Sequence, residues 1–198
     1  MSVYATTVTS GDYDRISGDV AARCTGGTYN PTSPWTDAGR TIVERSVNNG
    51  ASWQAVFTDT SYDTYWSGND IIRATGLYRI HYTGGTSAQF GDSFQESFSA
   101  PVRIAVIRKL TVSDRSTRSH SVGRFRLSPT TGLVGRRLTF QVRKAGHWRS
   151  YTRVRVTATG IFRVSFANSR RGISYRLPVP AAGGLSAHTY GPFKAYRR

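Results

Sequence analysis

Apolar and polar residues alternate with a period of two through much of this 198-residue chain, and this pattern constrains the fold more than any other feature. In one clear example, Phe162, Val164 and Phe166 are separated by Arg163 and Ser165. Successive side chains of a β-strand point to opposite faces of a sheet, so the alternation predicts strands with one buried and one solvated face. The three- and four-residue spacing of amphipathic helices is missing. The sequence therefore predicts an all-β protein.

Short strands separated by turn residues every 8 to 12 positions or so favour a β-sandwich over βαβ units. Only Lys144 to Gly146 separates the third and fourth strands of the second half, which predicts a hairpin. We expect a Greek-key, Ig-like arrangement, with the third, fourth, sixth and seventh strands in one sheet and the other three in the second sheet. The expected strands lie near residues 108–113, 121–128, 136–143, 147–156, 160–167, 173–179 and 186–196.

An internal repeat indicates two copies of one module. The matched segments, in chain order, are 39–40 with 135–136, 53 with 148, 74–80 with 158–164, and 84–88 with 183–187. The repeat predicts two tandem Ig-like β-sandwich domains, residues 1–107 and 108–198, joined by a short and stiff connection. Trp148 shares the parity of Val154 and Val156, so we assign it to the core, and by the repeat Trp53 as well.

Five short motifs lie in the second copy. They are Gly-Arg-x-Leu at 135–138, Gly-x-Trp at 146–148, Ala-x-Gly-x-Phe at 158–162, Tyr-Arg-x-x-Val at 175–179 and Gly-Gly at 183–184. With these motifs the second copy resembles the Ig-like repeats of actinobacterial secreted and surface proteins, and the first copy resembles them more loosely. The resemblance implies an Ig-like fold and an extracellular setting, and it implies no particular ligand.

The two halves of the chain differ in charge. The whole chain has 27 Lys and Arg against 11 Asp and Glu, a formal charge of +16. Residues 1–100 hold 6 basic and 10 acidic side chains, whereas residues 101–198 hold 21 basic and 1 acidic. Nearly all the basic residues are arginines, whose planar guanidinium groups pair bidentately with phosphate and carboxylate. The second half is therefore a candidate for binding a polyanion.

The alternation arranges these arginines on two outward faces of the second copy. A grid of guanidinium groups favours phosphate or carboxylate polymers, with an affinity that falls as salt rises. The alternative is that arginine merely solubilises exposed strands in a protein from a GC-rich genome. Arg124, Arg126 and Arg163 belong to one face, and Tyr151 accompanies the arginines of the other. The candidate polyanion-binding residues on that other face are Arg137, Arg143, Arg149, Arg153, Arg155 and Arg176.

Two stretches of the first copy are longer than their counterparts. Trp53 and Gly76 are 23 positions apart, against 12 for Trp148 and Gly160, which predicts 11 extra residues between the fourth and fifth strands. A similar comparison of residues 24–39 with 128–135 predicts about 8 extra residues between the second and third strands. In an Ig-like topology both insertions emerge at one end of the sandwich, together with the sixth-to-seventh loop.

The inserted segments are rich in Tyr, Trp, Asn and Asp, a composition that suits protein or glycan recognition. The alternative is that these aromatic side chains cover the end of the core or pack on the second domain. The candidate partner-binding residues are Tyr29, Trp35, Asp59, Tyr62, Asp63, Tyr65, Trp66 and Phe90, with Asn30, Asp37, Asn69, Asp70 and Gln89 beside them.

Catalytic and metal-binding patterns are weak. The four histidines lie far apart in sequence, and Cys24 is the only cysteine. Asp114 is the only carboxylate residue after position 100, which excludes paired-carboxylate hydrolysis in the second copy. Asp59, Asp63 and Asp70 lack the spacing of a calcium loop. We therefore expect a non-enzymatic protein with no metal and no cofactor.

Neither a membrane-span pattern nor a signal-peptide pattern is recognisable in this sequence. No apolar stretch approaches the 20 or so residues of a membrane span. Met1 to Tyr4 lacks the pattern of a signal peptide, so we expect either a removed export signal or another exit route, such as a virion. Arg-rich helices, zinc fingers and RNA-binding aromatic motifs are missing too, so sequence-specific nucleic-acid binding is not expected.

Together these patterns predict an extracellular or surface-exposed binding and structural module. Its second half would hold a polyanionic surface, namely a cell-wall polymer or an acidic protein, and its first-half loops would bind a protein or glycan partner. The alternative function is a component of a virion, as capsid decoration or tail, or of a surface filament. The opposite charges of the two halves also suit self-association or assembly into a larger particle.

Overall fold

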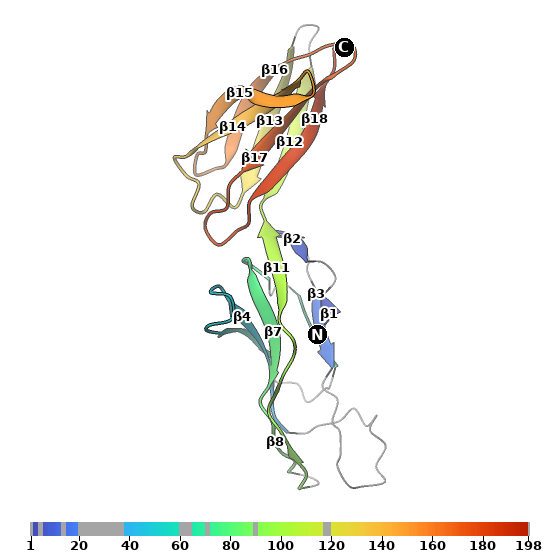
Figure 1. The fold of residues 1–198 in the computed structure, drawn as a ribbon, viewed down its shortest axis with the longest axis vertical. Helices are drawn as coiled ribbons and strands as arrows, with labels where there is room; N and C mark the ends of the chain where they lie inside the picture. Colours follow the sequence, from blue (N-terminus) through green and yellow to red (C-terminus); the bar gives the residue numbers. More distant parts are fainter. Residues whose placement is uncertain are drawn as a thin grey trace. The chain divides into compact units, whose positions relative to one another are not determined.

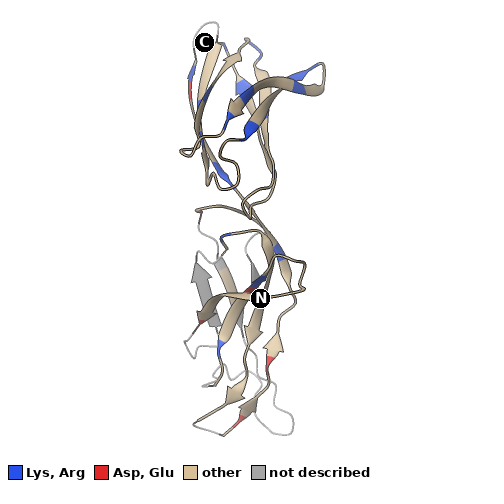
Figure 2. Cartoon of the chain, turned by 90° about the vertical axis from the view of Figure 1, so that its left-hand side faces the viewer, with Lys and Arg blue, Asp and Glu red and all other residues tan. Residues whose placement is uncertain are grey.

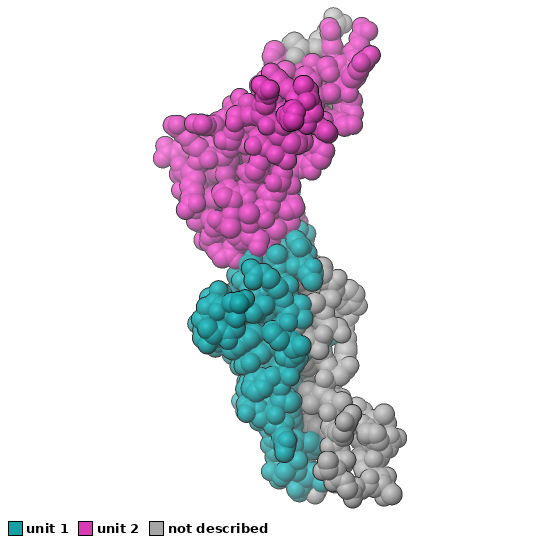
Figure 3. Space-filling view, in the orientation of Figure 1, with its two compact units in different colours: residues 1–105 teal, residues 106–198 magenta. Residues whose placement is uncertain are grey.

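The computed structural model describes residues 2–3, 6–12, 15–19, 38–59, 65–69, 72–88, 91–116 and 120–197. The chain divides into two compact units, residues 1–105 (unit 1) and residues 106–198 (unit 2) (Figure 3). All the regular elements in these ranges are β-strands, which confirms the predicted all-β class. None of the described segments is a helix long and apolar enough to cross a membrane.

Unit 2 is a sandwich of two antiparallel sheets (Figure 1). The first sheet has the order β12-β13-β16, with bounds Lys109–Ser116, His120–Ser128 and Ile161–Ala167. The second sheet has the order β15-β14-β17-β18, with bounds His147–Arg155, Arg137–Lys144, Ile173–Val179 and His188–Ala195. The first, second and fifth strands of the unit thus form one sheet and the remaining strands form the other. This confirms the predicted Ig-like Greek key.

Alternation places a cluster of aromatic rings between the two sheets of unit 2. Phe125 on β13 is 1% exposed, and its ring centroid lies 5.0 Å from that of Phe140 on β14 and 5.5 Å from that of Phe162 on β16. Phe166 and Tyr175 extend the cluster, with their centroids 4.6 Å apart. Burial of such large apolar side chains is the main favourable term in folding, and offset or edge-on ring pairs add to it. The polar residues between them remain on the outer faces.

A β-bulge in the β14–β15 hairpin reverses the expected side-chain parity. Leu138 pairs with Val154, but the register shifts after Phe140, and Arg143 pairs with Trp148. A bulge inserts one extra residue into one strand. The side chains on the far side of the bulge, here those nearer the hairpin turn, therefore point to the opposite face from the one that alternation predicts. The assignment of Trp148 to the core is therefore wrong. Trp148 is only half-buried, on the outer face of the sheet.

Two tyrosines of unit 2, the buried Tyr175 and the half-buried Tyr190, make its stability sensitive to alkaline pH. Tyr175 is 1% exposed and its hydroxyl donates to the Ala167 carbonyl at 2.9 Å. Burial, reinforced by the neighbouring Tyr151, raises the pKa of Tyr175 from 10.0 to about 12. Burial likewise raises the pKa of Tyr190 to about 12. A group whose pKa is higher in the folded state contributes stability below its unfolded pKa and loses it as the pH rises through the folded value.

We therefore expect the free energy of unfolding of unit 2 to fall between pH 10 and pH 12, with about 2 to 3 kcal/mol of that fall coming from Tyr175. Denaturant unfolding of the full chain across this range, followed by circular dichroism, measures the change. Tyr175→Phe has no phenol to ionise, so its unfolding free energy should depend less on pH. An equal pH dependence in the wild type and in Tyr175→Phe would contradict the expectation.

Unit 1 has the same arrangement of strands with additional short elements. Its smaller sheet has the order β1-β3-β6, with bounds Ser2–Val3, Arg15–Asp19 and Tyr65–Asn69. Its larger sheet has the order β2-β11-β7-β4-β5, with bounds Thr7–Thr9, Val102–Ile107, Gly76–Tyr82, Thr41–Ser46 and Gln54–Asp59. The remaining strands are β10 (Ser97–Phe98), which pairs with β7, and the β8–β9 ribbon (Gly85–Thr86 with Ser93–Phe94).

Strand pairing corrects the internal repeat. β7 pairs with β4 of the β4–β5 hairpin, just as β17 pairs with β14 of the β14–β15 hairpin. The bulge also recurs, after Val43 in unit 1 and after Phe140 in unit 2. β7 is thus the counterpart of β17, and the sequence match of residues 74–80 with 158–164 is wrong. Tyr78 on β7 donates its hydroxyl to the Ala74 carbonyl, a tyrosine corner of the kind found at this strand in Ig-like domains.

The corrected alignment removes one of the predicted insertions. β6 lies beside β3 as β16 lies beside β13, so β6 is the fifth strand of unit 1. β5 ends at Asp59 and β6 begins at Tyr65, much as β15 ends at Arg155 and β16 begins at Ile161. The 11 residues counted as extra came from matching β7 to the wrong strand. Tyr65 and Trp66 therefore lie in a strand, and their assignment to a loop is wrong.

Candidate functional site

The outer face of the β15-β14-β17-β18 sheet carries most of the candidate polyanion-binding arginines; we call it the four-strand face. Arg137 on β14 pairs directly with Arg155 on β15, and Thr139 pairs with Arg153. Directly opposed side chains on neighbouring strands have Cβ atoms about 5 Å apart, and residues two positions along one strand lie about 7 Å apart. Arg137, Arg153 and Arg155 therefore form a compact triangle of exposed guanidinium groups.

The positive charge of this face is not neutralised by carboxylates within the described part of unit 2. Asp114, the only Asp or Glu of unit 2, lies on β12 in the other sheet. Figure 2 shows many basic positions and scarcely any acidic ones along the strands of this unit. Like charges directly opposite each other destabilise a sheet. An anion placed between Arg137 and Arg155 would relieve that repulsion.

A stacked pair continues the face at the hairpin end. The guanidinium carbon of Arg176 lies 4.4 Å from the ring centroid of Trp148, and Arg176 Nε donates to Gln141 Oε1 at 2.6 Å. Trp148 also pairs across the strands with the exposed Arg143. Stacking on an aromatic ring fixes a guanidinium group without removing its charge. Arg176 is thus held in place, and its remaining N–H groups extend the positive face.

Unit 1 contains an equivalent arginine–tryptophan stack, but there a glutamate neutralises the charge of the arginine. The guanidinium carbon of Arg79 lies 4.2 Å from the ring centroid of Trp53, in the same position on the sheet as Arg176 over Trp148. Its hydrogen-bond acceptor, however, is Glu44, with Arg79 Nε 2.7 Å from Glu44 Oε2. Trp53 is half-buried on this outer face, so its assignment to the core is wrong as well. The counterpart of Glu44 in unit 2 is the neutral Gln141, so only unit 2 keeps the full charge of its stacked arginine.

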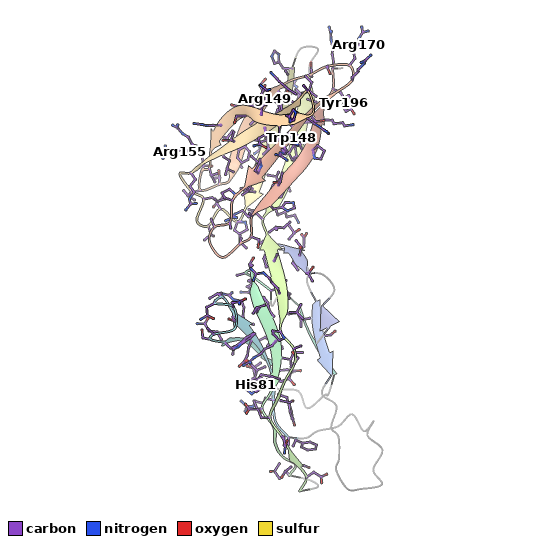
Figure 4. The ribbon with its side chains drawn as sticks, viewed as in Figure 1. His81, Trp148, Arg149, Arg155, Arg170 and Tyr196 are labelled. Carbon is purple, nitrogen blue, oxygen red and sulfur yellow. The ribbon has the colours of Figure 1, made fainter. Side chains whose placement is uncertain are left out.

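Two residues assigned to the four-strand face lie elsewhere because of the bulge. Arg149 pairs with the buried Val142, so it is on the inner side of the sheet, although it remains exposed near the hairpin (Figure 4). Tyr151 turns toward the core, where its ring centroid lies 5.9 Å from that of Phe166 and its hydroxyl donates to the Ser165 carbonyl at 2.8 Å. The residues that share the face are Arg137, Arg143, Arg153, Arg155 and Arg176.

Most candidate partner-binding residues of unit 1 lie outside the described residues. This applies to Tyr29, Asn30, Trp35, Asp37, Tyr62, Asp63, Asp70, Gln89 and Phe90. Asp59 is the last residue of β5 and is half-buried. Trp66 and Tyr65 pair with Gly18 and Asp19 of β3. A partner-binding role for these residues stays a prediction.

The outer face of unit 1 contains a polar cluster that the sequence did not reveal. His81 lies with Nδ1 3.2 Å from Glu44 Oε1 and Nε2 2.7 Å from Glu96 Oε1, and its ring stacks on Phe98 at 4.5 Å. Arg79 is held between Trp53 and Phe98, with its guanidinium carbon 4.2 Å from each ring. Within the described ranges, no three His, Cys, Asp or Glu side chains are arranged to hold a metal ion. The cluster fixes the segment containing β10 against β7.

The comparisons with known proteins are sparse. No model of a protein family matches the sequence, and no curated protein matches it. Among solved structures, the chain is similar to the FN1-FN3 domains of chicken CNTN1, with 11% sequence identity and a TM-score of 0.27. The match covers 98% of this chain and 63% of that chain, so this chain spans less than two thirds of its length.

Proposed function

We propose that the protein is a non-enzymatic binding and structural module that attaches to an anionic polymer through the four-strand face of unit 2. The observation that carries this proposal is the opposed pair Arg137 and Arg155, flanked by Arg153 and left without a carboxylate partner in the described residues. Guanidinium groups in such a grid bind phosphate or carboxylate groups of a polymer by releasing its condensed counterions. A fixed, flat surface of this kind suits attachment.

The proposed partner is a polymer of the cell surface, and the proposed location of the protein is therefore outside the cell. The resemblance of the motifs between residues 135 and 184 to secreted repeat proteins supports this location. The probes are purified cell walls, long-chain polyphosphate and poly-glutamate. The two simple polymers test whether phosphate or carboxylate groups alone are enough for binding, and the cell walls test the complete wall polymer. Recovery of the protein in purified virions, with no retention on cell walls, would instead support the alternative role as a virion component.

The difference between Glu44 and Gln141 provides a matched test. In Gln141→Glu, the new carboxylate should pair with Arg176 as Glu44 pairs with Arg79, and it adds one negative charge to the face. We expect affinity for polyphosphate to fall on the order of fivefold, since one exposed ion pair contributes up to about 1 kcal/mol. Equilibrium binding of fluorescent polyphosphate at low salt measures the change.

The reverse exchange in unit 1, Glu44→Gln, is the control. It alters the net charge by the same amount but lies on the neutralised stack, so polymer affinity should change much less than in Gln141→Glu. Far-ultraviolet circular dichroism should show both variants folded. If the two exchanges shifted the affinity equally in opposite directions, binding would follow net charge alone, and the assignment of the site to the four-strand face would be abandoned.

A further inference from the structure

A second set of arginines lies on the opposite layer of unit 2. On the β12-β13-β16 sheet, Arg124 pairs directly with Arg163, as Arg137 does with Arg155 on the other sheet. Arg126 lies two positions along β13 from Arg124. All three side chains are exposed. We call this outer surface the three-strand face.

The three-strand face also lacks a neutralising carboxylate among the described residues. Asp114 pairs with the buried Gly123, so it belongs to the inner side of β12, whereas the exposed Arg115 lies on the outer side with Arg124. Ser113 pairs with Arg124, which leaves a small side chain beside the arginine pair. The face is thus a second triangle of guanidinium groups with one directly opposed pair. Repulsion within that pair favours an anion between its members.

The two faces are separate sites because the sandwich lies between them. Packed sheets are about 10 Å apart, and the arginines extend outward from both. The Debye length at physiological ionic strength is about 8 Å, so binding at one face has little electrostatic effect on the other. One short segment of polymer contacts only one face.

We propose that unit 2 is bivalent and crosslinks two strands of anionic polymer, one on the four-strand face and one on the three-strand face. This inference rests on the proposed function, because it takes the same polymer as ligand at both faces. Each face is positively charged, and this charge is complementary to that of an anionic polymer. A module that joins two polymer strands crosslinks a polymer network and so contributes to its structure. A module with one binding face would only attach to the network.

Crosslinking is tested with particles coated with long-chain polyphosphate. The wild-type protein should aggregate the particles at intermediate concentration and disperse them at excess, because excess protein saturates every strand separately. Arg124→Ser/Arg163→Ser should keep at least half of the particle binding through the four-strand face and lose the aggregation. Light scattering measures aggregation, and sedimentation of labelled protein with dilute particles measures binding.

The outcomes separate the two proposals. If the wild type binds the particles without aggregating them, or if Arg124→Ser/Arg163→Ser aggregates them as the wild type does, bivalency is wrong and the proposed function stands. If the wild type does not bind, both are wrong. Arg170→Ser/Arg171→Ser removes the same charge from exposed turn positions and should still aggregate the particles. The thermal midpoint of Arg124→Ser/Arg163→Ser should equal or exceed that of the wild type, since an unfavourable charge pair is removed.

Discussion

Replacing Arg108 with methionine is expected to lower the free energy of unfolding of unit 2 by on the order of 3 kcal/mol, because three backbone carbonyl groups would lose a charged donor. Arg108 is 1% exposed, although it is an arginine. Its Nε donates to the Pro129 carbonyl at 3.0 Å, and its Nη2 donates to the carbonyls of Thr131 and Ala182 at 2.8 and 2.7 Å. Tyr190 donates its hydroxyl to the carbonyl of Arg108 itself.

These contacts tie together two loops at one end of unit 2. Pro129 and Thr131 belong to the loop between β13 and β14, and Ala182 belongs to the loop between β17 and β18. Burial of the Arg108 side chain lowers the pKa of its guanidinium group, because it disfavours the charged form. Methionine fills a similar volume but donates no hydrogen bond. A loss of 3 kcal/mol in a domain of this size corresponds to a fall in thermal midpoint of roughly 10 to 20 °C.

Differential scanning calorimetry of the full chain measures this effect. Arg170→Met makes the same chemical change at an exposed turn position and should leave the thermal midpoint close to that of the wild type (Figure 4). The thermal midpoint of Arg108→Lys should lie between those of Arg108→Met and Arg170→Met, since an ammonium group keeps the charge but lacks the planar fork of the guanidinium group. A midpoint for Arg108→Met equal to that of Arg170→Met would show that the buried contacts contribute nothing.

The strands of unit 2 and their division between two sheets were predictable from the sequence because burial of one face leaves a clear alternation. Phe125, Leu127 and Phe162 each follow it, and each is buried. The arginines between them are exposed for the same reason. The pattern also determines which strands can share a sheet once the short hairpin at residues 144–146 is recognised.

Alternation predicted the wrong face for side chains of β15 beyond the point where the β14–β15 register shifts. The positions of Trp148, Arg149 and Tyr151 were deduced by counting back from Val154, and the bulge inverts that count. A bulge leaves little trace in the alternation of one strand, because the inverted residues there are polar, aromatic or exposed. Here the outer face offers Trp148 a guanidinium group to stack on, which makes an outward tryptophan favourable.

Similar local sequences can belong to different strands. Residues 74–80 and 158–164 share a glycine turn followed by alternation, yet the first segment pairs with β4 and the second with β13. Strand pairing depends on long-range contacts that a short match does not contain. The cluster around His81 was missed for the same reason, since Glu44 and Glu96 lie 37 and 15 positions from His81.

In a chain that already carries Arg124→Ser/Arg163→Ser, so that only the four-strand face binds polymer, adding Arg153→Ala/Arg155→Ala is expected to weaken polymer binding on the order of tenfold or more at low salt, because each guanidinium group lost is one fewer contact with the polymer. Both side chains are exposed and lie on the outer side of an edge strand, so the substitution should leave the fold intact. Arg170→Ala/Arg171→Ala removes an equal charge from exposed residues of a turn and serves as the control. Equal losses in the two double variants would mean that overall charge, rather than the four-strand face, governs binding.

The dependence of polyphosphate affinity on salt concentration tests the central claim most directly. Five guanidinium groups on the four-strand face should give a slope of roughly −3.5 for the logarithm of the association constant against the logarithm of salt concentration, between about 50 and 200 mM. The slope for Arg153→Ala/Arg155→Ala should be shallower by more than one, and that for Arg170→Ala/Arg171→Ala should resemble the wild type. A wild-type slope near zero, or the same slope in all three proteins, would contradict the claim that unit 2 holds a polyanion through this face.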